Sequence, residues 1–90
     1  MEPFISIVIP VYNEERRIAS VLDEVFRYLD GQSWTYEVII ADDGSADGGT
    51  RVVEEWMRRR PALSLVRLAV NQGKGAAVRA GMLRAKGRVR

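Results

Sequence analysis

The residues best suited to chemistry in this chain are two adjacent carboxylates, Asp42 and Asp43, which directly follow the apolar run Ile39-Ile40-Ala41. A strand that ends in this way places two negative charges at its carboxyl end, where open α/β sheets bind their ligands. Because adjacent carboxylates repel each other, the pair costs stability unless it has partners or a function. Gly44 and Ser45 come next, so a strand followed by a turn and a helix cap also explains these residues. Taken alone, the segment leaves both interpretations open.

Composition narrows the chemistry that the chain can perform. Its 90 residues include no cysteine and no histidine, which excludes zinc thiolates, histidine metal sites and a Ser-His-Asp triad within this chain. A content of 47% hydrophobic and 29% charged residues is typical of a soluble globular protein. The net charge of +2 is too small to indicate a nucleic-acid partner. Any site must therefore use carboxylates, lysine, arginine, tyrosine, hydroxyls or backbone groups.

The start of the chain does not resemble a targeting segment. The start, Met1-Glu2-Pro3, has no basic region followed by a long apolar run, so we expect no signal peptide. No stretch approaches the ~20 apolar residues that a membrane-spanning helix needs. We therefore expect a cytoplasmic location.

The hydrophobic pattern predicts three strands that alternate with three helices. The strands are rich in apolar and β-branched residues, and the helices carry apolar stripes at helical spacing. The expected strands are 4–11, 36–41 and 63–70, and the expected helices are 14–30, 47–60 and 76–86. Such alternation implies right-handed crossovers and a parallel sheet. The predicted fold is therefore α/β, a three-layer α/β/α, Rossmann-like arrangement.

Local signals predict where some elements begin and end. Asn13 suits the cap of the first helix, with Glu14 and Glu15 in its first turn. Gly87 is a candidate cap for the end of the third helix, whose many small residues would let it lie close to a sheet or a ligand. The segment Arg88-Val89-Arg90 resembles the first residues of a further strand.

Polar residues follow each predicted strand, and in a parallel sheet these loops share one edge. The three loops carry Pro10, Tyr12, Asn13 and Glu14, then Asp42, Asp43, Gly44 and Ser45, then Asn71, Gly73, Lys74 and Gly75. Together they offer an aromatic ring, carboxylates for base or ribose hydrogens, and a cation flanked by glycines for a diphosphate. Each piece alone is also explained by an ordinary surface loop, so their co-location is the stronger signal for a nucleotide site.

Two common phosphate-binding motifs are absent. A Walker loop needs a glycine five positions before Gly73, where Leu68 stands, and Ser or Thr after Lys74, where Gly75 stands. No Gly-x-Gly-x-x-Gly follows the first predicted strand, which disfavours a standard dinucleotide site.

Three segments nevertheless resemble the amino-terminal half of a family 2 glycosyltransferase. They are residues 7–15 (IVIPVYNEE), 42–48 (DDGSADG) and 71–81 (NQGKGAAVRAG). The likeness is greatest to the dolichyl- or polyprenyl-phosphate mannose and glucose synthases, and it covers nearly all of the chain. It implies a GT-A fold, the nucleotide-sugar-binding fold of these enzymes.

The resemblance also implies roles for individual residues. By it, Pro10, Tyr12 and Glu14 line the nucleoside pocket, Asp42 hydrogen-bonds the base with Asp43 close by, and Lys74 lies near the diphosphate. The implied reaction is inverting transfer of a sugar from a UDP- or GDP-sugar to an acceptor, often a polyprenyl phosphate. Mg²⁺ or Mn²⁺ would neutralise the leaving diphosphate. For the whole protein the implied location includes the cytoplasmic face of a membrane.

The chain differs from that family in its extent. In relatives, the strand after the third helix ends in an Asp-x-Asp-type metal motif, and the acceptor site lies further on. We therefore expect residues 1–90 to be the amino-terminal donor-nucleotide-binding part, without catalytic residues or metal ligands of its own, and inactive alone. A non-catalytic nucleotide-binding module and a purely structural fragment remain alternatives.

The same resemblance places the first strand beside a fourth one in the complete sheet. In this chain the strand Phe4–Val11 would then present an unpaired apolar edge. Because such edges recruit other chains, we expect self-association through this strand.

Overall fold

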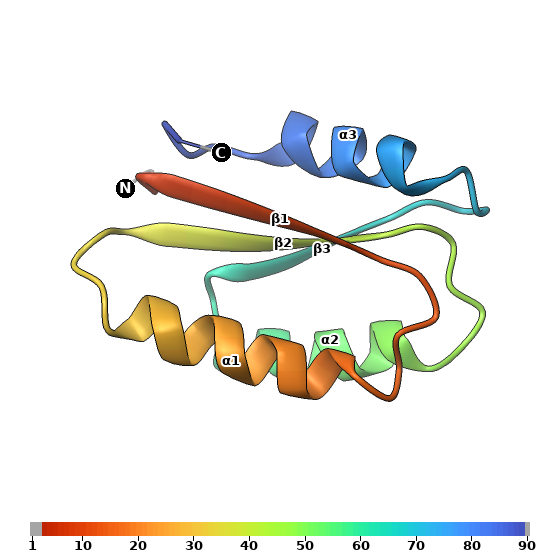
Figure 1. Ribbon diagram of the computed structural model, residues 1–90, viewed down its shortest axis with the longest axis horizontal. Coiled ribbons are helices and arrows are strands. Elements are labelled where there is room, and N and C mark those ends of the chain that lie inside the picture. The colour runs from red at the N-terminus through yellow and green to blue at the C-terminus, as the bar shows by residue number, and fades with distance from the viewer. Residues whose placement is uncertain (1–2, 90) are drawn as a thin grey trace.

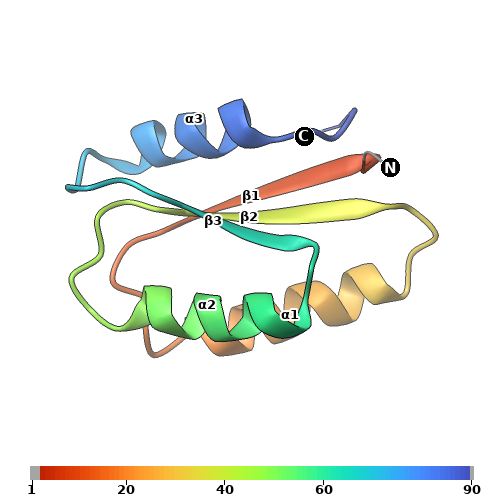
Figure 2. The ribbon, with the colours of Figure 1, turned by 180° about the vertical axis from the view of Figure 1, so that it is seen from behind.

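The computed structural model describes residues 3–89 and contains a three-stranded parallel sheet between two layers of helices (Figure 1). The elements are β1 (Ile5–Val11), α1 (Ile18–Asp30), β2 (Tyr36–Asp42), α2 (Gly49–Arg59), β3 (Leu63–Arg67) and α3 (Lys74–Arg84). The strand β2 is central, α1 and α2 cover one face, and α3 covers the other (Figures 1 and 2). The predicted three-layer parallel α/β fold is confirmed. Met1, Glu2 and Arg90 lie outside the described residues.

The main core lies between the sheet and the layer formed by α1 and α2. The buried residues of α1 recur every three or four positions, which places them on one side of the helix. The ring of Phe26 stacks on that of Trp56, with 6.1 Å between their centroids, and so joins the two helices. The buried members of this core are Ile18, Leu22, Phe26, Leu29, Val38, Ile40, Val53 and Leu63.

The opposite face of the sheet is covered by a helix of small residues. Gly81 of α3 lies directly over Val8 of β1, and a Cβ added at Gly81 would overlap the Cγ1 atom of Val8. The same Cβ would lie 3.4 Å from the Cβ of Ala41 in β2. The small residues of α3 therefore let the helix approach the sheet closely, as the sequence predicts.

The strand register brings the carboxyl ends of all three strands to one level. Val11 of β1 pairs with Asp42 of β2, and Asp42 pairs with Arg67 of β3. The predicted third strand continues to residue 70, but β3 ends at Arg67, and the amide of Leu68 makes a last bond to the Asp42 carbonyl, 2.9 Å away. The chain then turns toward α3, which begins at Lys74, two residues earlier than predicted.

Two of the predicted helix caps are wrong. The helix α1 begins at Ile18 without a side-chain cap, because the Asn13 side chain bonds to the loop after β2 instead. Glu14 and Glu15 accordingly precede the helix rather than form its first turn. The helix α3 ends at Arg84, so Gly87 does not cap it. Gly87 instead packs against Ser6 of β1, so closely that a Cβ added to Gly87 would lie only 2.5 Å from the Ser6 amide nitrogen.

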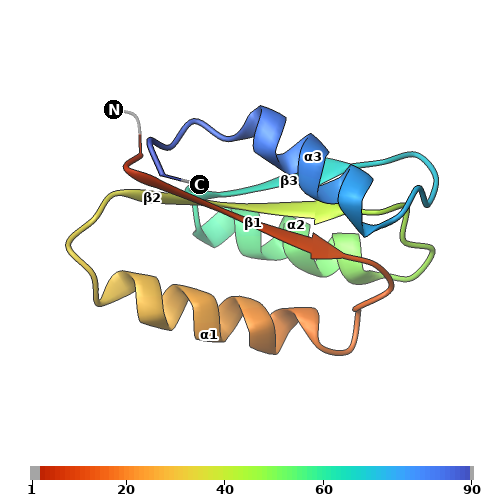
Figure 3. The same ribbon diagram turned by 45° about the horizontal axis from the view of Figure 1, so that its top comes forward.

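The segment after α3 begins to pair with the outer edge of β1, as predicted for residues 88–90. Val89 forms a parallel bridge with Ile5, in which its carbonyl accepts from the Ser6 amide at 2.7 Å. Its own amide donates to the Phe4 carbonyl at 2.9 Å. In Figure 3 the carboxyl-terminal segment lies beside the start of β1.

The amino end of the sheet is closed by charged and aromatic groups. Asp30 accepts hydrogen bonds from the Tyr36 hydroxyl at 2.9 Å and from Arg60 at 3.1 Å. These bonds, that from Tyr36 first, hold the pKa of Asp30 below its ordinary value. Burial, together with the bond to Asp30, raises the pKa of Tyr36. Within residues 3–89, none of the helices combines the length and the apolar character needed to cross a bilayer.

The close approach of α3 predicts how two glycines of that helix respond to alanine. We expect Gly81→Ala to lower the free energy of unfolding by about 1–3 kcal/mol, because Val8 is β-branched and cannot easily turn away from the new methyl group. Gly75→Ala is the matched control, since an added Cβ there meets nothing within 4 Å and the helix gains up to about 1 kcal/mol. Urea unfolding measures both changes, and equal effects would show that α3 does not pack as described.

Candidate functional site

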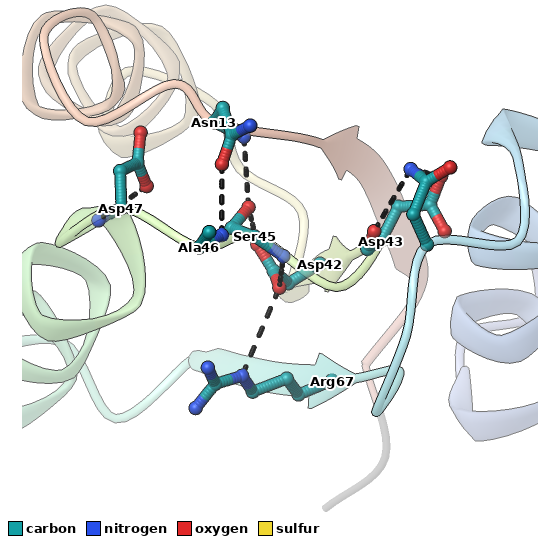
Figure 4. A network of polar contacts seen from close by, with 9 residues as sticks. Asn13, Asp42, Asp43, Ser45, Ala46, Asp47 and Arg67 are labelled. Carbon is teal, nitrogen blue, oxygen red and sulfur yellow. Dashed lines mark hydrogen bonds and ion pairs between the residues drawn. The ribbon is translucent and has the colours of Figure 1, made fainter.

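Asp42 is buried at the end of β2 and holds the loop that follows it. Only 2% of its side chain is exposed. Its carboxylate accepts from the Ser45 amide at 2.9 Å and also from the Ser45 hydroxyl. The Nε atom of Arg67, in β3, lies 3.9 Å away (Figure 4). Both carboxylate oxygens therefore already have partners within the protein.

Asp43 holds a different loop, the one between β3 and α3. Its carboxylate accepts from the Asn71 side chain at 2.9 Å, the Gln72 amide at 2.8 Å and the Gly73 amide at 2.9 Å. The two adjacent carboxylates point apart in Figure 4, as expected for successive residues at the end of a strand. Each is thus surrounded by its own donors, which offsets the repulsion between them.

Glycine at position 44 makes this arrangement possible. Gly44 has a φ of 76°, a left-handed conformation that L residues rarely adopt. A Cβ at this position would also overlap the backbone of Val70 and Asn71. The backbone of the β3–α3 loop therefore passes directly against Gly44.

The loop after β1 is joined to the loop after β2 by hydrogen bonds in both directions. The Asn13 amide donates to the Ser45 hydroxyl, and the Asn13 side-chain oxygen accepts from the Ala46 amide, both at 2.9 Å (Figure 4). Asn13 itself has a φ of 52°, which asparagine tolerates better than most residues. A series of hydrogen bonds from Asn13 through Ser45 to Asp42 thus connects the first two loops. Asp43 connects the second loop to the third.

These loops border a cleft of about 340 Å³ at the end of β1, within the size range of small-molecule sites. Five of the six predicted site residues line it: Pro10, Tyr12, Glu14, Asp43 and Lys74. The sixth, Asp42, lies behind the cleft and borders a void of only about 10 Å³. The cleft runs across the end of β1, because its lining includes residues of α1 on one face of the sheet and of α3 on the other.

Charged groups lie at both sides of this cleft. Lys74, the first residue of α3, is exposed, and its side chain has no bonding partner within residues 3–89. On the α1 side, Arg17 binds the Glu14 carboxylate through its Nε atom at 2.8 Å and its Nη2 atom at 2.5 Å. Sequence reasoning missed Arg17, although its spacing of three residues from Glu14 is a signal for such a pair.

The cleft also has an apolar part that the sequence did not identify as a site. Ile9 and Val11 of β1 and Ile18 and Val21 of α1 line it beside Pro10. Their spacing within a strand and a helix is that of ordinary core residues. These residues border a surface cleft because they lie at or beside the end of an edge strand, and only the fold reveals that position.

The described residues do not form a metal site. Within residues 3–89 no group of three or more histidine, cysteine, aspartate or glutamate side chains is placed to hold an ion. The oxygens of Asp42 and Asp43 are engaged by N–H and O–H donors, which a bound cation would have to displace. These residues therefore do not fit a divalent cation.

Comparison with known proteins gives one family for nearly the whole chain. Residues 6–89 match the family described as Glycosyl transferase family 2. The dolichyl-phosphate beta-glucosyltransferase ALG5A of Trichomonas vaginalis is 40% identical over 89 residues, which are 93% of this chain and 28% of that protein.

Two solved structures share the arrangement of elements. The mannosyltransferase PcManGT of Pyrobaculum calidifontis, in complex with GDP-Man and Mn²⁺, has a TM-score of 0.79 and 28% identity over 94% of this chain and 25% of its own. S. aureus TarS 1-349, in complex with UDP-GlcNAc, has a TM-score of 0.79 and 27% identity over 97% of this chain and 24% of its own. The chain thus spans about a quarter of the length of the proteins that it matches.

The contacts of Asp43 predict a selective effect of its replacement. In Asp43→Asn an amide group would face three N–H donors, so we expect the free energy of unfolding to fall by about 1–3 kcal/mol. We also expect faster amide hydrogen exchange at Gln72 or at Gly73, because these amides bond to different oxygens of Asp43 and asparagine keeps only one acceptor oxygen. Asp23→Asn is the control, because Asp23 is exposed on α1 and its pair with Arg27 contributes little. An Asp43→Asn variant that is as stable as this control would contradict the role given to Asp43.

Proposed function

Because this chain belongs to glycosyl transferase family 2, we propose that its cleft binds the nucleoside diphosphate of an activated sugar. The observation that carries the proposal is that one cleft gathers an aromatic ring, an acceptor carboxylate and an unpaired cation, from Tyr12, Glu14 and Lys74. These are the groups that a base, a nucleoside and a diphosphate require. They come from loops that Asp42 and Asp43 hold in place.

The position of each side chain supports a role in binding. Tyr12 is 47% exposed beside Pro10, so that its ring is available to pack against a base or ribose. Lys74 lies at the amino end of α3, where the helix dipole adds to its attraction for phosphate. Asp43 acts at one remove, since it bonds to the two backbone amides just before Lys74. A bond from Asp42 to the base stays a prediction, and it would require Asp42 to give up one of its bonds to Ser45.

For the whole protein we propose inverting transfer of a sugar from a UDP- or GDP-sugar to a polyprenyl phosphate such as dolichyl phosphate. The similarity to a dolichyl-phosphate glucosyltransferase supports the acceptor, and the GDP-Man and UDP-GlcNAc complexes of the structural neighbours support the donor class. Residues 1–90 would form the donor-binding part of this enzyme, at or near the cytoplasmic face of a membrane. We propose Mg²⁺ or Mn²⁺ as its cofactor, and the described residues hold no cluster of three or more side chains that could bind the ion by themselves.

Calorimetric titration of this chain with UDP and GDP tests the proposal. We expect weak binding of at least one of them, unchanged by Mn²⁺, because the described residues contain no cluster of three or more candidate ligands for the ion. Lys74→Ala should weaken binding about tenfold through the loss of a charge-assisted bond to phosphate. Lys86→Ala removes the chain's other lysine, which lies two residues beyond the end of α3 and away from the cleft, and it should leave binding unchanged.

The outcomes separate a structural fragment from the two alternatives in which the chain binds a nucleotide. If neither nucleotide binds, the chain is a structural fragment and the proposal fails for it. Binding without any sugar transfer to dolichyl phosphate agrees with the donor-binding part, and it also describes a non-catalytic module. Transfer by this chain alone would show that our placement of the remaining machinery is wrong.

We also propose that the chain self-associates through the outer edge of β1. In the described sheet β1 is an edge strand, and Val89 covers only its first residues. Because the backbone groups of alternate residues point to the same side, Val8 faces outward as Ser6 does. Such unpaired groups can bind the edge of a second copy.

Sedimentation velocity over a concentration series tests self-association. We expect the weight-average sedimentation coefficient to rise with concentration, because pairing of two edges is a bimolecular step. A coefficient that stays at the monomer value up to the highest concentration would contradict the proposal.

A further inference from the structure

We propose that Glu15 and Asp47 are positioning residues for the cleft: they hold the backbone on the carboxyl-terminal side of Glu14 and so keep the Glu14 carboxylate directed toward a bound nucleotide. The inference rests on the proposed function, namely that the cleft binds a nucleoside diphosphate. Neither Glu15 nor Asp47 lines the cleft, so both would act through Glu14 without contacting the nucleotide.

The first observation is a set of hydrogen bonds between Glu15 and the segment before α2. The Glu15 amide donates to Oδ2 of Asp47 at 3.1 Å, and the Gly48 amide donates to Oε1 of Glu15 at 3.0 Å. The other oxygen of Asp47, Oδ1, accepts from the Gly49 amide at 2.9 Å. These three bonds, which we call the Glu15–Asp47 clasp, attach the loop after β1 to the start of α2. Figure 4 shows Asp47 at this end of the helix.

The start of α2 favours both carboxylates. Gly48 and Gly49 have no side chain that could cap the helix, so their amides need acceptors from other residues. Glu15 and Asp47 supply these acceptors, and the helix dipole stabilises their negative charges at this end. The Glu15 carboxylate lies so close to Gly48 that a Cβ added there would be 2.7 Å from Oε2. Glycine at position 48 therefore leaves the space that the clasp needs.

The second observation is an alternation along the loop after β1. Asn13 and Glu15 bond to the loop after β2. Tyr12 and Glu14, which alternate with them, line the cleft instead. Glu14 thus lies between two anchored residues, with Asn13 held by Ser45 on one side and the clasp on the other. Tyr12 lies beyond Asn13, so the clasp does not determine its position.

The turn that follows Glu14 explains why the clasp matters for its direction. The Glu14 carbonyl accepts from the amides of Arg17 and Ile18, at 2.9 and 2.8 Å, so the chain begins to coil toward α1 directly after Glu14. Without the clasp, the backbone between Asn13 and this turn would gain conformational freedom. A nucleotide would then have to order the Glu14 carboxylate on binding, and that loss of entropy lowers the affinity.

The test compares Glu15→Ala with Glu15→Gln in NMR titrations of the full chain with UDP and GDP. Both variants lose the same negative charge, but glutamine keeps an oxygen that can accept from the Gly48 amide. For the nucleotide that the unmodified chain binds, Glu15→Ala should weaken binding about three- to tenfold, and Glu15→Gln should restore the affinity to within about twofold. Glu55→Ala is the control for charge, because Glu55 is exposed on α2 and lies outside the cleft lining.

A second comparison separates the positioning of Glu14 from a general loosening of the fold. In a Glu14→Ala background, Glu15→Ala should weaken binding no further, because the carboxylate that the clasp directs is gone. In a Tyr12→Leu background it should weaken binding by the same factor as in the unmodified chain, because Tyr12 is held through Asn13. A purely structural role of Glu15 would give the same loss in both backgrounds.

Amide hydrogen exchange at Gly48 shows whether the clasp forms when no nucleotide is present. We expect faster exchange in Glu15→Ala than in the unmodified chain or Glu15→Gln, and an unprotected Gly48 amide in the unmodified chain overturns the inference. Equal affinity of Glu15→Ala and Glu15→Gln, at a temperature where circular dichroism shows both to be folded, also overturns it. So does an equal loss in the two backgrounds.

In each of these contrary cases the unmodified chain still binds a nucleotide, so the proposed function stands and only the role of the clasp is refuted. If the unmodified chain binds neither UDP nor GDP, the proposed function fails and this inference fails with it.

Discussion

Asp42 and Asp43 are buried next to each other at the carboxyl end of β2, where water cannot solvate their charges. Buried carboxylates must find hydrogen-bond donors within the protein, because an unpaired one costs several kcal/mol. Asp42 finds them in the loop that follows β2, and Asp43 finds them in the loop that follows β3. The need to satisfy two charges thus determines the course of the second and third loops. The first loop joins them because Asn13 bonds to Ser45, which Asp42 already holds.

The consequence is a cleft whose bordering loops are held by hydrogen bonds within the protein. A flexible loop that becomes ordered on binding loses conformational entropy, and that loss lowers the affinity. Here Lys74 follows a turn whose amides are bonded to Asp43, and Tyr12 precedes a residue bonded to the second loop. The backbones on both sides of the cleft are therefore already placed, and only exposed side chains need to settle. The two acidic residues that look most reactive in the sequence thus hold the loops beside the cleft through hydrogen bonds, and their predicted contact with a nucleotide stays a prediction.

The sequence predicts the fold well because its signals are local and repeated. Apolar runs, helical spacing and alternation give the three strands, the three helices and the parallel sheet. It predicts less well what depends on contacts across the fold. Asn13 has the chemistry of a helix cap, but the backbone of Ala46 offers it a donor 33 positions along the chain. Arg17 looks like a surface arginine, and only the position of β1 at the sheet's edge shows that it lines a cleft.

The edge position of β1 also explains why the cleft can stay open at its outer side. Backbone groups of alternate residues in a strand point to the same side, and the Ser6 amide points outward to Val89. Pro10, four residues further along β1, faces the same side but has no N–H to donate. A segment that pairs with the outer edge of β1 at Ser6 therefore receives no hydrogen bond from β1 at the level of Pro10. A proline in a strand is tolerated at such an edge because its missing N–H then breaks no bond within the sheet. Proline thus weakens strand pairing at the level where the cleft begins, and the fold keeps an accessible surface beside Tyr12 without giving up the bonds between β1 and β2.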